Sequence, residues 1–374
     1  MVASLLVMLL PGLRSAVWLA VISMVAMVGT YRRAVFGYVL INLLVYVFVS
    51  ALAWLTATFK LRQQDRWRWS CVAMLALLAV FLGGRYYQLE SYGLSFGGLQ
   101  LFLYSLNMWA FLRLITLLWE FGSGKIAMPS LVSYVMWVGL PFTLIGPILR
   151  YSEFERQLPL DSERENSGRI ISASWFGKLL LASVQIVLGL GLSAFQVWLS
   201  GAGVGMPRWE RVAISFSIAP WSFYLLWAGY FKFMEALAPF WGLNLPPSFN
   251  RPFGRRNLSE FWANWNMTAT SVFRDYFFYN RWGLTRVNLY LNTLIVFLMV
   301  GVWHGLNGYW ILWGLMHGIG FCAFLWYRSN KQRFAAWHQK FPAAPLRLAS
   351  IGATYVYVCS CWFLPPTILK LIRW

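Results

Sequence analysis

The chain has 374 residues, of which 59% are hydrophobic and only 11% are charged, and its mean hydropathy is +0.58. Because a soluble globular domain carries roughly 25% charged residues, this composition excludes an ordinary soluble protein. The net charge is +19, from 31 Lys and Arg against 12 Asp and Glu. The basic residues cluster in short gaps between apolar runs, as anionic lipid surfaces and the positive-inside rule require. No basic groove-reading domain is visible, so we expect no nucleic-acid partner.

Apolar runs follow one another along the whole chain. They fall at 2–10, 15–31, 34–59, 70–83, 99–119, 128–149, 172–200, 212–242, 288–303, 307–327 and 346–369. Most are long enough to span a bilayer as helices, and they lack the alternation typical of barrel strands. We therefore expect an all-α integral membrane protein with about nine to eleven transmembrane helices, plus re-entrant or interfacial helices around a central polar chamber.

The beginning of the chain leaves the membrane orientation open. The first run ends at Pro11-Gly12 and is too short to span, so we expect it to be re-entrant or interfacial. The first basic residue is Arg14, which favours a retained membrane segment over a cleaved signal peptide. The strongest basic loop, Lys60–Arg68, belongs in the cytoplasm by the positive-inside rule, but Arg32 and Arg33 would then face outward.

Two polar stretches interrupt the apolar pattern. Residues 150–170 carry mixed charge and are expected to form a soluble loop. Residues 244–287 combine aromatic side chains with Asn and Arg, which makes them too polar to face lipid and too aromatic for a plain loop. Non-spanning backbone at membrane depth survives only where protein buries it or where it lines a cavity. We therefore expect this second segment to line the chamber.

His304 is the first candidate for chemistry. It lies in Gly301-Val-Trp-His-Gly305, on an apolar run, and only His317 and His338 share its residue type. An imidazole can accept or donate a proton near neutral pH, and polar residues inside a membrane are candidates for function because their burial is costly. The alternative is a core histidine that is hydrogen-bonded to a neighbour.

Glycines surround both intramembrane histidines at a spacing that permits close helix contact. Gly301 and Gly305 are four residues apart, as are Gly314 and Gly318, and small residues at this spacing let helices approach closely in a membrane. On one straight helix, His304 and His317 would lie about 20 Å apart along the axis. The Gly305-Leu-Asn-Gly308 break instead favours two helices, with His317 supporting the site or lining an access tunnel.

Asn266 is the second candidate, and Trp262 and Trp265 come shortly before it in the same aromatic patch. An amide can hold an acyl carbonyl or a hydroxyl in place but cannot serve as a base. Just before it, Asn257-Leu-Ser-Glu is typical of a helix start with a capping side chain. Arg274-Asp275 most simply forms a local ion pair, although an arginine in such a segment could also bind a phosphate or carrier group.

The cysteines and acidic residues indicate no metal site. Four cysteines lie within or beside apolar runs, where cysteine usually behaves as a small hydrophobe: Cys71, Cys322, Cys359 and Cys361. The Cys-x-Cys pair has no histidine nearby, so we expect no bound metal and no tightly bound cofactor.

These residues carry a family resemblance. Five ordered motifs resemble the membrane-bound O-acyltransferase superfamily: Phe249-Asn-Arg-Pro-Phe, Ser259-Glu-Phe-Trp-x-x-Trp, Phe273-Arg-Asp-Tyr, Val302-Trp-His-Gly and Trp313-Gly-Leu-x-His-Gly. Upstream, Gly146-Pro-Ile-Leu-Arg-Tyr is similar to a motif of the bacterial branch. That branch includes the membrane subunit of alginate O-acetylation and the D-alanyl transfer protein of teichoic acid synthesis. The matched span runs from about 141 to 325.

The resemblance implies the fold of that superfamily and a division of the chain into N-terminal membrane helices (1–95), a catalytic core (96–330) and a C-terminal loop and membrane helix (331–374). It implies that His304 is catalytic, in a tunnel that joins a cytoplasmic donor to the acceptor side. The bacterial polysaccharide branch usually has Trp-His where this chain has Trp265-Asn266. Asparagine there resembles the lipid- and sterol-acylating branches, which leaves the class of acceptor open.

The sequence thus favours an O-acyltransferase of the bacterial inner membrane. It would move a short acyl group, acetyl from acetyl-CoA or from an acyl carrier protein thioester, onto a hydroxyl of a cell-envelope or exported polysaccharide, directly or through an extracytoplasmic relay protein. His304 would act as general base and Asn266 would place the acyl carbonyl or the acceptor. Supporting residues would be His317, Trp303, Trp262, Trp265, Arg274, Asp275, Asn250 and Arg251. One alternative is a lipid or lysophospholipid acceptor, and another is a proton-coupled transporter or flippase.

Overall fold

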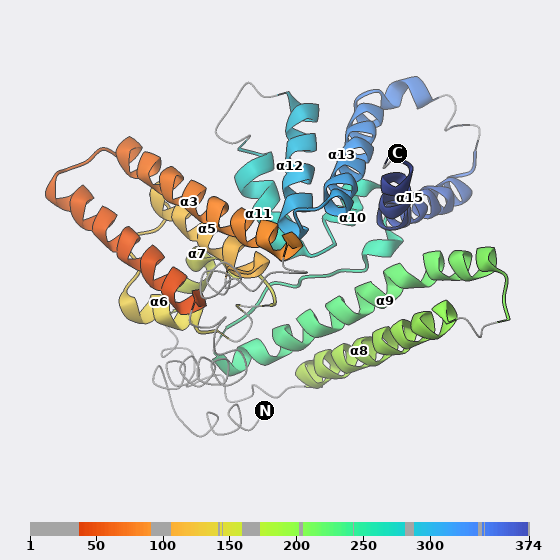
Figure 1. The fold of residues 1–374 in the computed structure, drawn as a ribbon, viewed down its shortest axis with the longest axis horizontal. Coiled ribbons are helices and arrows are strands. Elements are labelled where there is room, and N and C mark those ends of the chain that lie inside the picture. The colour runs from red at the N-terminus through yellow and green to blue at the C-terminus, as the bar shows by residue number, and fades with distance from the viewer. Residues whose placement is uncertain are drawn as a thin grey trace. The chain divides into compact units, whose positions relative to one another are not determined.

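The structure is a computed structural model that describes residues 37–90, 106–140, 143, 145–158, 173–201, 205–241, 243–280, 288–335, 339 and 341–372. Within these ranges every regular element is helical (Figure 1). The elements are Gly37–Thr58, α3 (Gln63–Glu90), α5 (Met108–Gly122), α6 (Leu131–Val138), α7 (Tyr151–Glu155), α8 (Ala173–Ser200), α9 (Arg208–Leu237), η2 (Ala238–Trp241), η3 (Pro252–Gly254), α10 (Leu258–Trp262), α11 (Met267–Val272), η4 (Phe273–Phe278), α12 (Leu289–His304), α13 (Gly308–Ser329), η6 (Lys331–Phe334) and α15 (Ala343–Ile372). The expected all-α class is confirmed.

Six of the described helices are long and apolar enough to cross a membrane. They lie at Gly37–Thr58, Gln63–Gly84, Trp175–Ser200, Arg208–Leu237, Gly308–Ser329 and Ala343–Leu371, and the 16-residue α12 is shorter but equally apolar. These helices match the expected runs from 34 onward, apart from the two runs at 99–119 and 128–149. The runs at 2–10 and 15–31, with Arg14, Arg32 and Arg33, lie outside the described residues, as does His338.

The apolar run at 128–149 is not one continuous helix in the part that the structure describes. Its helical part, α6, has only eight residues and ends at Val138. Gly139 follows as the cap, and Pro141 and Pro147 come next in the sequence. Proline lacks the backbone N–H that a helix needs and disfavours the helical conformation of the residue before it. An apolar run of sufficient length is therefore not a spanning helix when prolines interrupt it.

Residue contacts divide the chain into two compact units, Met1–Phe176 with Met234–Pro246 and Gly177–Phe233 with Pro247–Trp374. In the first unit, the buried guanidinium of Arg113 on α5 donates a 2.6 Å hydrogen bond to the carbonyl of Trp137 at the end of α6. The guanidinium carbon, Cζ, also lies 4.4 Å from the centre of the Trp137 ring. A cation is favoured at a helix C-terminus and over an indole face, so this arginine joins the two helices.

The Gly-Pro-Ile-Leu-Arg motif also lies in the first unit, directly before α7. Glu120 of α5 is fully buried and pairs with Lys125. It also accepts a 2.7 Å hydrogen bond from the hydroxyl of Ser152 on α7. A buried carboxylate is tolerated only when it is paired and hydrogen-bonded, so this contact fixes α7 against α5.

The second unit contains most of α8 and α9, together with α10 to α15. In Figure 1, α8 and α9 run side by side, and their hydroxyls at Ser193 and Ser222 are 2.6 Å apart. Two prolines lie inside α15, Pro365 and Pro366. Pro366 cannot donate to the carbonyl of Trp362 one turn earlier, and the hydroxyl of Tyr309 donates to that carbonyl instead, at 3.1 Å. A tertiary hydrogen bond thus satisfies the carbonyl that the proline leaves open.

Candidate active site

His304 is the last residue of α12, at a sharp break between two helices of the second unit. Gly305 caps α12 through its N–H, which donates to the carbonyl of Gly301 at 3.0 Å. The side chain of Asn307 begins α13 by accepting a 3.1 Å hydrogen bond from the N–H of Trp310. The break predicted at 305–308 is confirmed, and α12 and α13 lie beside each other in Figure 1.

The two helices cross at their glycines, so the predicted close approach is confirmed. A Cβ atom at Gly314 would lie 2.5 Å from the carbonyl oxygen of Phe297 and 3.3 Å from the Cα of Gly301. A Cβ at Gly301 would likewise meet the carbonyl of Trp310. Only glycine allows this separation, and the resulting contact fixes the histidine-bearing turns relative to each other.

Aromatic rings surround the imidazole of His304. Trp310 stacks on it, with ring centres 4.7 Å apart and an interplanar angle of 18°. Trp303 lies at 4.7 Å with a tilt of 59°, and Trp313 meets it edge-on at 5.3 Å. The ring is only partly buried. It is therefore held in a fixed orientation while part of its surface stays accessible to a substrate.

His317 lies on α13, and its imidazole is enclosed by other side chains. It is fully buried, and within the described residues neither of its ring nitrogens has a hydrogen-bond partner. The same holds for the indole nitrogens of Trp262 and Trp313. Each buried polar atom without a partner costs about 1–3 kcal/mol, so these atoms form an unusual group.

Two short helices carry the remaining candidates. Asn257 caps α10 as predicted, because its side chain accepts a 2.9 Å hydrogen bond from the N–H of Glu260. Asn266 precedes α11 in the left-handed conformation, with φ of 39°, and its side chain makes no capping bond. Its Oδ1 is buried without a partner among the described residues. An asparagine at this position normally caps the helix, so here its amide oxygen is left available.

Trp265 belongs to an aromatic core. It is buried and stacks on Phe261 and Phe223, with ring centres 5.4 Å and 6.2 Å apart. Further members of this core are Tyr224, Ala228, Phe253, Leu258 and Val358. Trp265 therefore packs against α10 through Phe261, and its expected role as a supporting site residue stays a prediction.

Four other expected site residues lie toward the surface. The side chains of Asn250 and Arg251 are exposed. Arg274 and Asp275 form the predicted local ion pair at 2.8 Å on the π-helical segment η4, and the Arg274 side chain is 47% exposed. Their role as substrate contacts stays a prediction.

Sequence reasoning did not select Trp310 and Trp313 as site residues. Both contact His304, and they stand three residues apart on α13, with His317 four residues further on. That spacing places all three side chains on one face of a helix. The periodicity was visible in the sequence, but the partner of this face was not.

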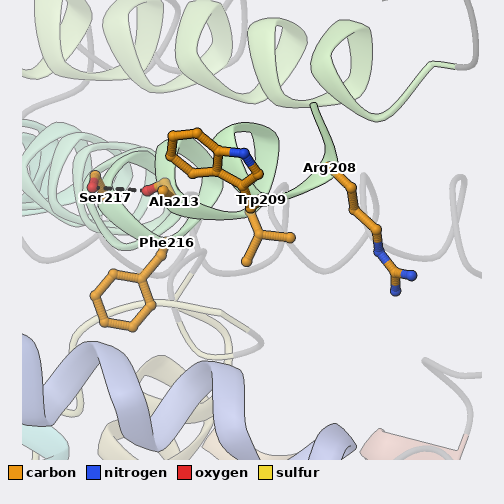
Figure 2. Close-up of a pocket in the computed structure, with 6 residues that line it drawn as sticks. Arg208, Trp209, Ala213, Phe216 and Ser217 are labelled. Carbon is orange, nitrogen blue, oxygen red and sulfur yellow. Dashed lines mark hydrogen bonds between the residues drawn. The ribbon is translucent and has the colours of Figure 1, made fainter. Parts of the chain in front are cut away.

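A separate groove of about 730 Å³ lies at the start of α9 (Figure 2). Its lining residues are Arg208, Trp209, Val212, Ala213, Phe216 and Ser217. The hydroxyl of Ser217 donates to the carbonyl of Ala213 at 2.9 Å. This proton is therefore used in a hydrogen bond within α9. The lining contains neither a histidine nor a carboxylate, and we assign no chemistry to the groove.

Comparison with known proteins identifies related chains. The model of the MBOAT, membrane-bound O-acyltransferase family, matches residues 34–364. The chain is 25% identical to peptidoglycan O-acetyltransferase of Helicobacter pylori over 54% of its length and 39% of that protein. It is 28% identical to teichoic acid D-alanyltransferase of Bacillus subtilis over 37% of each chain. It is 26% identical to the probable alginate O-acetylase AlgI of Pseudomonas putida over 55% of its own length and 42% of that protein. The matches thus span about two-fifths of these relatives.

Proposed function

The chain belongs to the membrane-bound O-acyltransferase family, and from this premise we propose that it transfers a short acyl group onto a hydroxyl of a cell-envelope or exported polysaccharide. The proposed group is acetyl, carried by acetyl-CoA or by an acyl carrier protein thioester. The names of the relatives support this class, because each denotes transfer of acetyl or D-alanyl in connection with an envelope or exported polymer. The proposed location is the inner membrane of a bacterium.

The observation that carries the proposal is the setting of His304. Its imidazole ends the apolar helix α12 and contacts the rings of Trp303, Trp310 and Trp313. A neutral imidazole that is held in place but partly accessible suits a general base, a role that contributes about 10²–10⁴-fold to a rate.

In the proposed step, the acceptor hydroxyl gives its proton to His304 while its oxygen attacks the thioester carbonyl carbon. A carbon–oxygen bond forms and the negative charge moves to the carbonyl oxygen. The carbon–sulfur bond then breaks, and the departing sulfur takes the proton from the imidazolium. The ester product and a free thiol result, and His304 returns to its neutral form.

Asn266 is proposed to place the acceptor. Its buried Oδ1 has no partner in the described part of the chain, and a hydroxyl is a suitable donor for it. An amide cannot take up the proton, so this residue would orient the acceptor and leave the base role to His304. The acceptor polymer is reached either directly or through an extracytoplasmic relay protein.

The test is transfer by the purified chain in lipid nanodiscs. His304→Gln preserves size and hydrogen bonding but cannot be protonated near neutral pH, and it should lower turnover at least 10²-fold while the protein stays folded. Trp198→Ala is the control, because this side chain is 58% exposed on α8. Turnover of His304→Gln near the unmodified level would refute the base role. Mass spectrometry of glycans and lipids from cells with and without the gene identifies the acceptor, and a change confined to lipids would refute the polysaccharide.

A further inference from the structure

Besides His304, the second unit contains a group of three neighbouring rings whose nitrogen atoms are buried: Trp262, Trp313 and His317. The ring centres of Trp313 and His317 are 4.6 Å apart, those of Trp262 and His317 are 5.0 Å apart, and those of Trp262 and Trp313 are 5.9 Å apart. We call these three residues the His317 cluster. They come from two elements of the second unit, α10 and α13. Four ring nitrogens of the cluster are buried without a partner among the described residues.

The cluster adjoins the proposed base. The Trp313 ring contacts both His317 and His304, with ring centres 4.6 Å and 5.3 Å apart. Phe297 stacks on His317 at 6.1 Å with an angle of 16°, and it closes the group with an apolar face. One member of the cluster, Trp313, is therefore in direct contact with the imidazole at which the reaction would occur.

The chemistry of the cluster is that of a hydrogen-bond donor site. An indole N–H only donates, and a neutral imidazole has one donor and one acceptor nitrogen. The cluster thus offers three donors and one acceptor, and none of its members carries a formal charge when His317 is neutral. Such a set suits a carbonyl oxygen, which accepts hydrogen bonds and gains negative charge during acyl transfer.

The neighbouring core shows that packing alone does not require these nitrogens. Around Trp265, phenylalanines at 223, 249, 253 and 261 supply four of the neighbouring rings, beside Tyr224 and Trp362. Phenylalanine fills an aromatic site with no polar atom to satisfy. The His317 cluster instead places three nitrogen-bearing rings in contact at the edge of the site.

We propose that the His317 cluster binds the carbonyl oxygen of the acyl donor and stabilises the negative charge that develops on it. The inference rests on the proposed function, since it names the group that this site recognises. Trp262, Trp313 and His317 donate through their ring N–H groups, while His304 takes the proton of the acceptor hydroxyl. The cluster thereby orients the thioester toward the base.

The experiment compares two analogues of acetyl-CoA that cannot react. In one, a methylene group replaces the thioester sulfur, so that a ketone carbonyl remains; in the other, ethyl-CoA, the carbonyl is missing. The unmodified chain in nanodiscs should bind the ketone about tenfold more tightly, the value of one net hydrogen bond. Trp313→Phe and His317→Phe keep an aromatic ring at each position and remove the nitrogens, and each should abolish this preference. Each should also lower kcat about 10²–10³-fold, with a smaller change in KM.

Trp362→Phe is the matched control. This tryptophan also contacts Trp313, with ring centres 6.4 Å apart, but its nitrogen is not among the buried unpartnered atoms. It should keep both the carbonyl preference and kcat. If the cluster variants keep the preference while the unmodified chain transfers acetyl, the inference is overturned and the proposed function stands. If the unmodified chain neither binds an analogue nor transfers acetyl, both are overturned.

Discussion

The close crossing of α12 and α13 provides a sharp test of how the site is held. In Gly314→Ala, the new methyl group would lie 2.5 Å from the carbonyl oxygen of Phe297, whereas ordinary contacts begin near 3.4 Å. The obstacle is backbone on the facing helix, so it cannot rotate away. The helices must therefore separate by about 1 Å, since packed interiors have no free space to absorb the methyl group.

Two consequences of this separation can be measured. Overpacking of this kind costs about 1–3 kcal/mol, and thermal unfolding in detergent should show a lower melting temperature. A displacement of about 1 Å between the turns that carry His304 and His317 should lower acyl transfer by about 10²-fold. Both effects have the same cause, so they should appear together in this one variant.

Gly191→Ala is the control for the loss of a helical glycine. Gly191 lies inside α8 with no atom within 4 Å of the position of a Cβ. Alanine there should leave activity unchanged and raise stability by up to about 1 kcal/mol, because alanine is the better helix former. If Gly314→Ala matched Gly191→Ala in both melting temperature and turnover, the crossing would not be what orients the two histidines.

Three further substitutions test individual supports by thermal unfolding. Asn257→Ala removes the cap of α10 and should cost about 1 kcal/mol, and an unchanged melting temperature would contradict the cap. Tyr309→Phe leaves the Trp362 carbonyl without its donor and should cost about 1–3 kcal/mol, whereas Tyr279→Phe, at a residue 68% exposed, should have no effect. Glu120→Gln sets an amide N–H₂ group against the donors of Lys125 and Ser152. It should lower the free energy of unfolding by about 1–3 kcal/mol, and a melting temperature equal to that of the unmodified chain would refute this.

Local features of the site were predictable because they depend on neighbours in the sequence. The break at 305–308 follows from two glycines and a capping Asn307. The start of α10 follows from Asn257 and Glu260. The Arg274-Asp275 pair needs only adjacent side chains. In each case the interacting atoms lie within a few residues, so the pattern of residue types contains the whole interaction.

Contacts between distant segments were not predictable in this way. The sequence separates Trp262 from His317 by more than fifty positions, and only the packing of α10 on α13 brings their rings within 5.0 Å. The stacking of Trp310 on His304 likewise depends on how sharply the chain reverses after α12. Asn250 and Arg251 have the polarity of site residues, but the fold places them at the surface.

By itself, the sequence determined that this chain is a helical membrane protein, where α10 begins and where α12 and α13 separate, and that His304 is the residue to test. Hydropathy, glycine spacing and capping chemistry are local properties, and the sequence records them directly. Only the tertiary structure decided that Trp262 packs on His317 and that His304 and His317 share Trp313 as a neighbour. The physical reason is that ring contacts and buried unpartnered atoms depend on how helices pack in space, and helix packing couples residues that lie far apart in the chain.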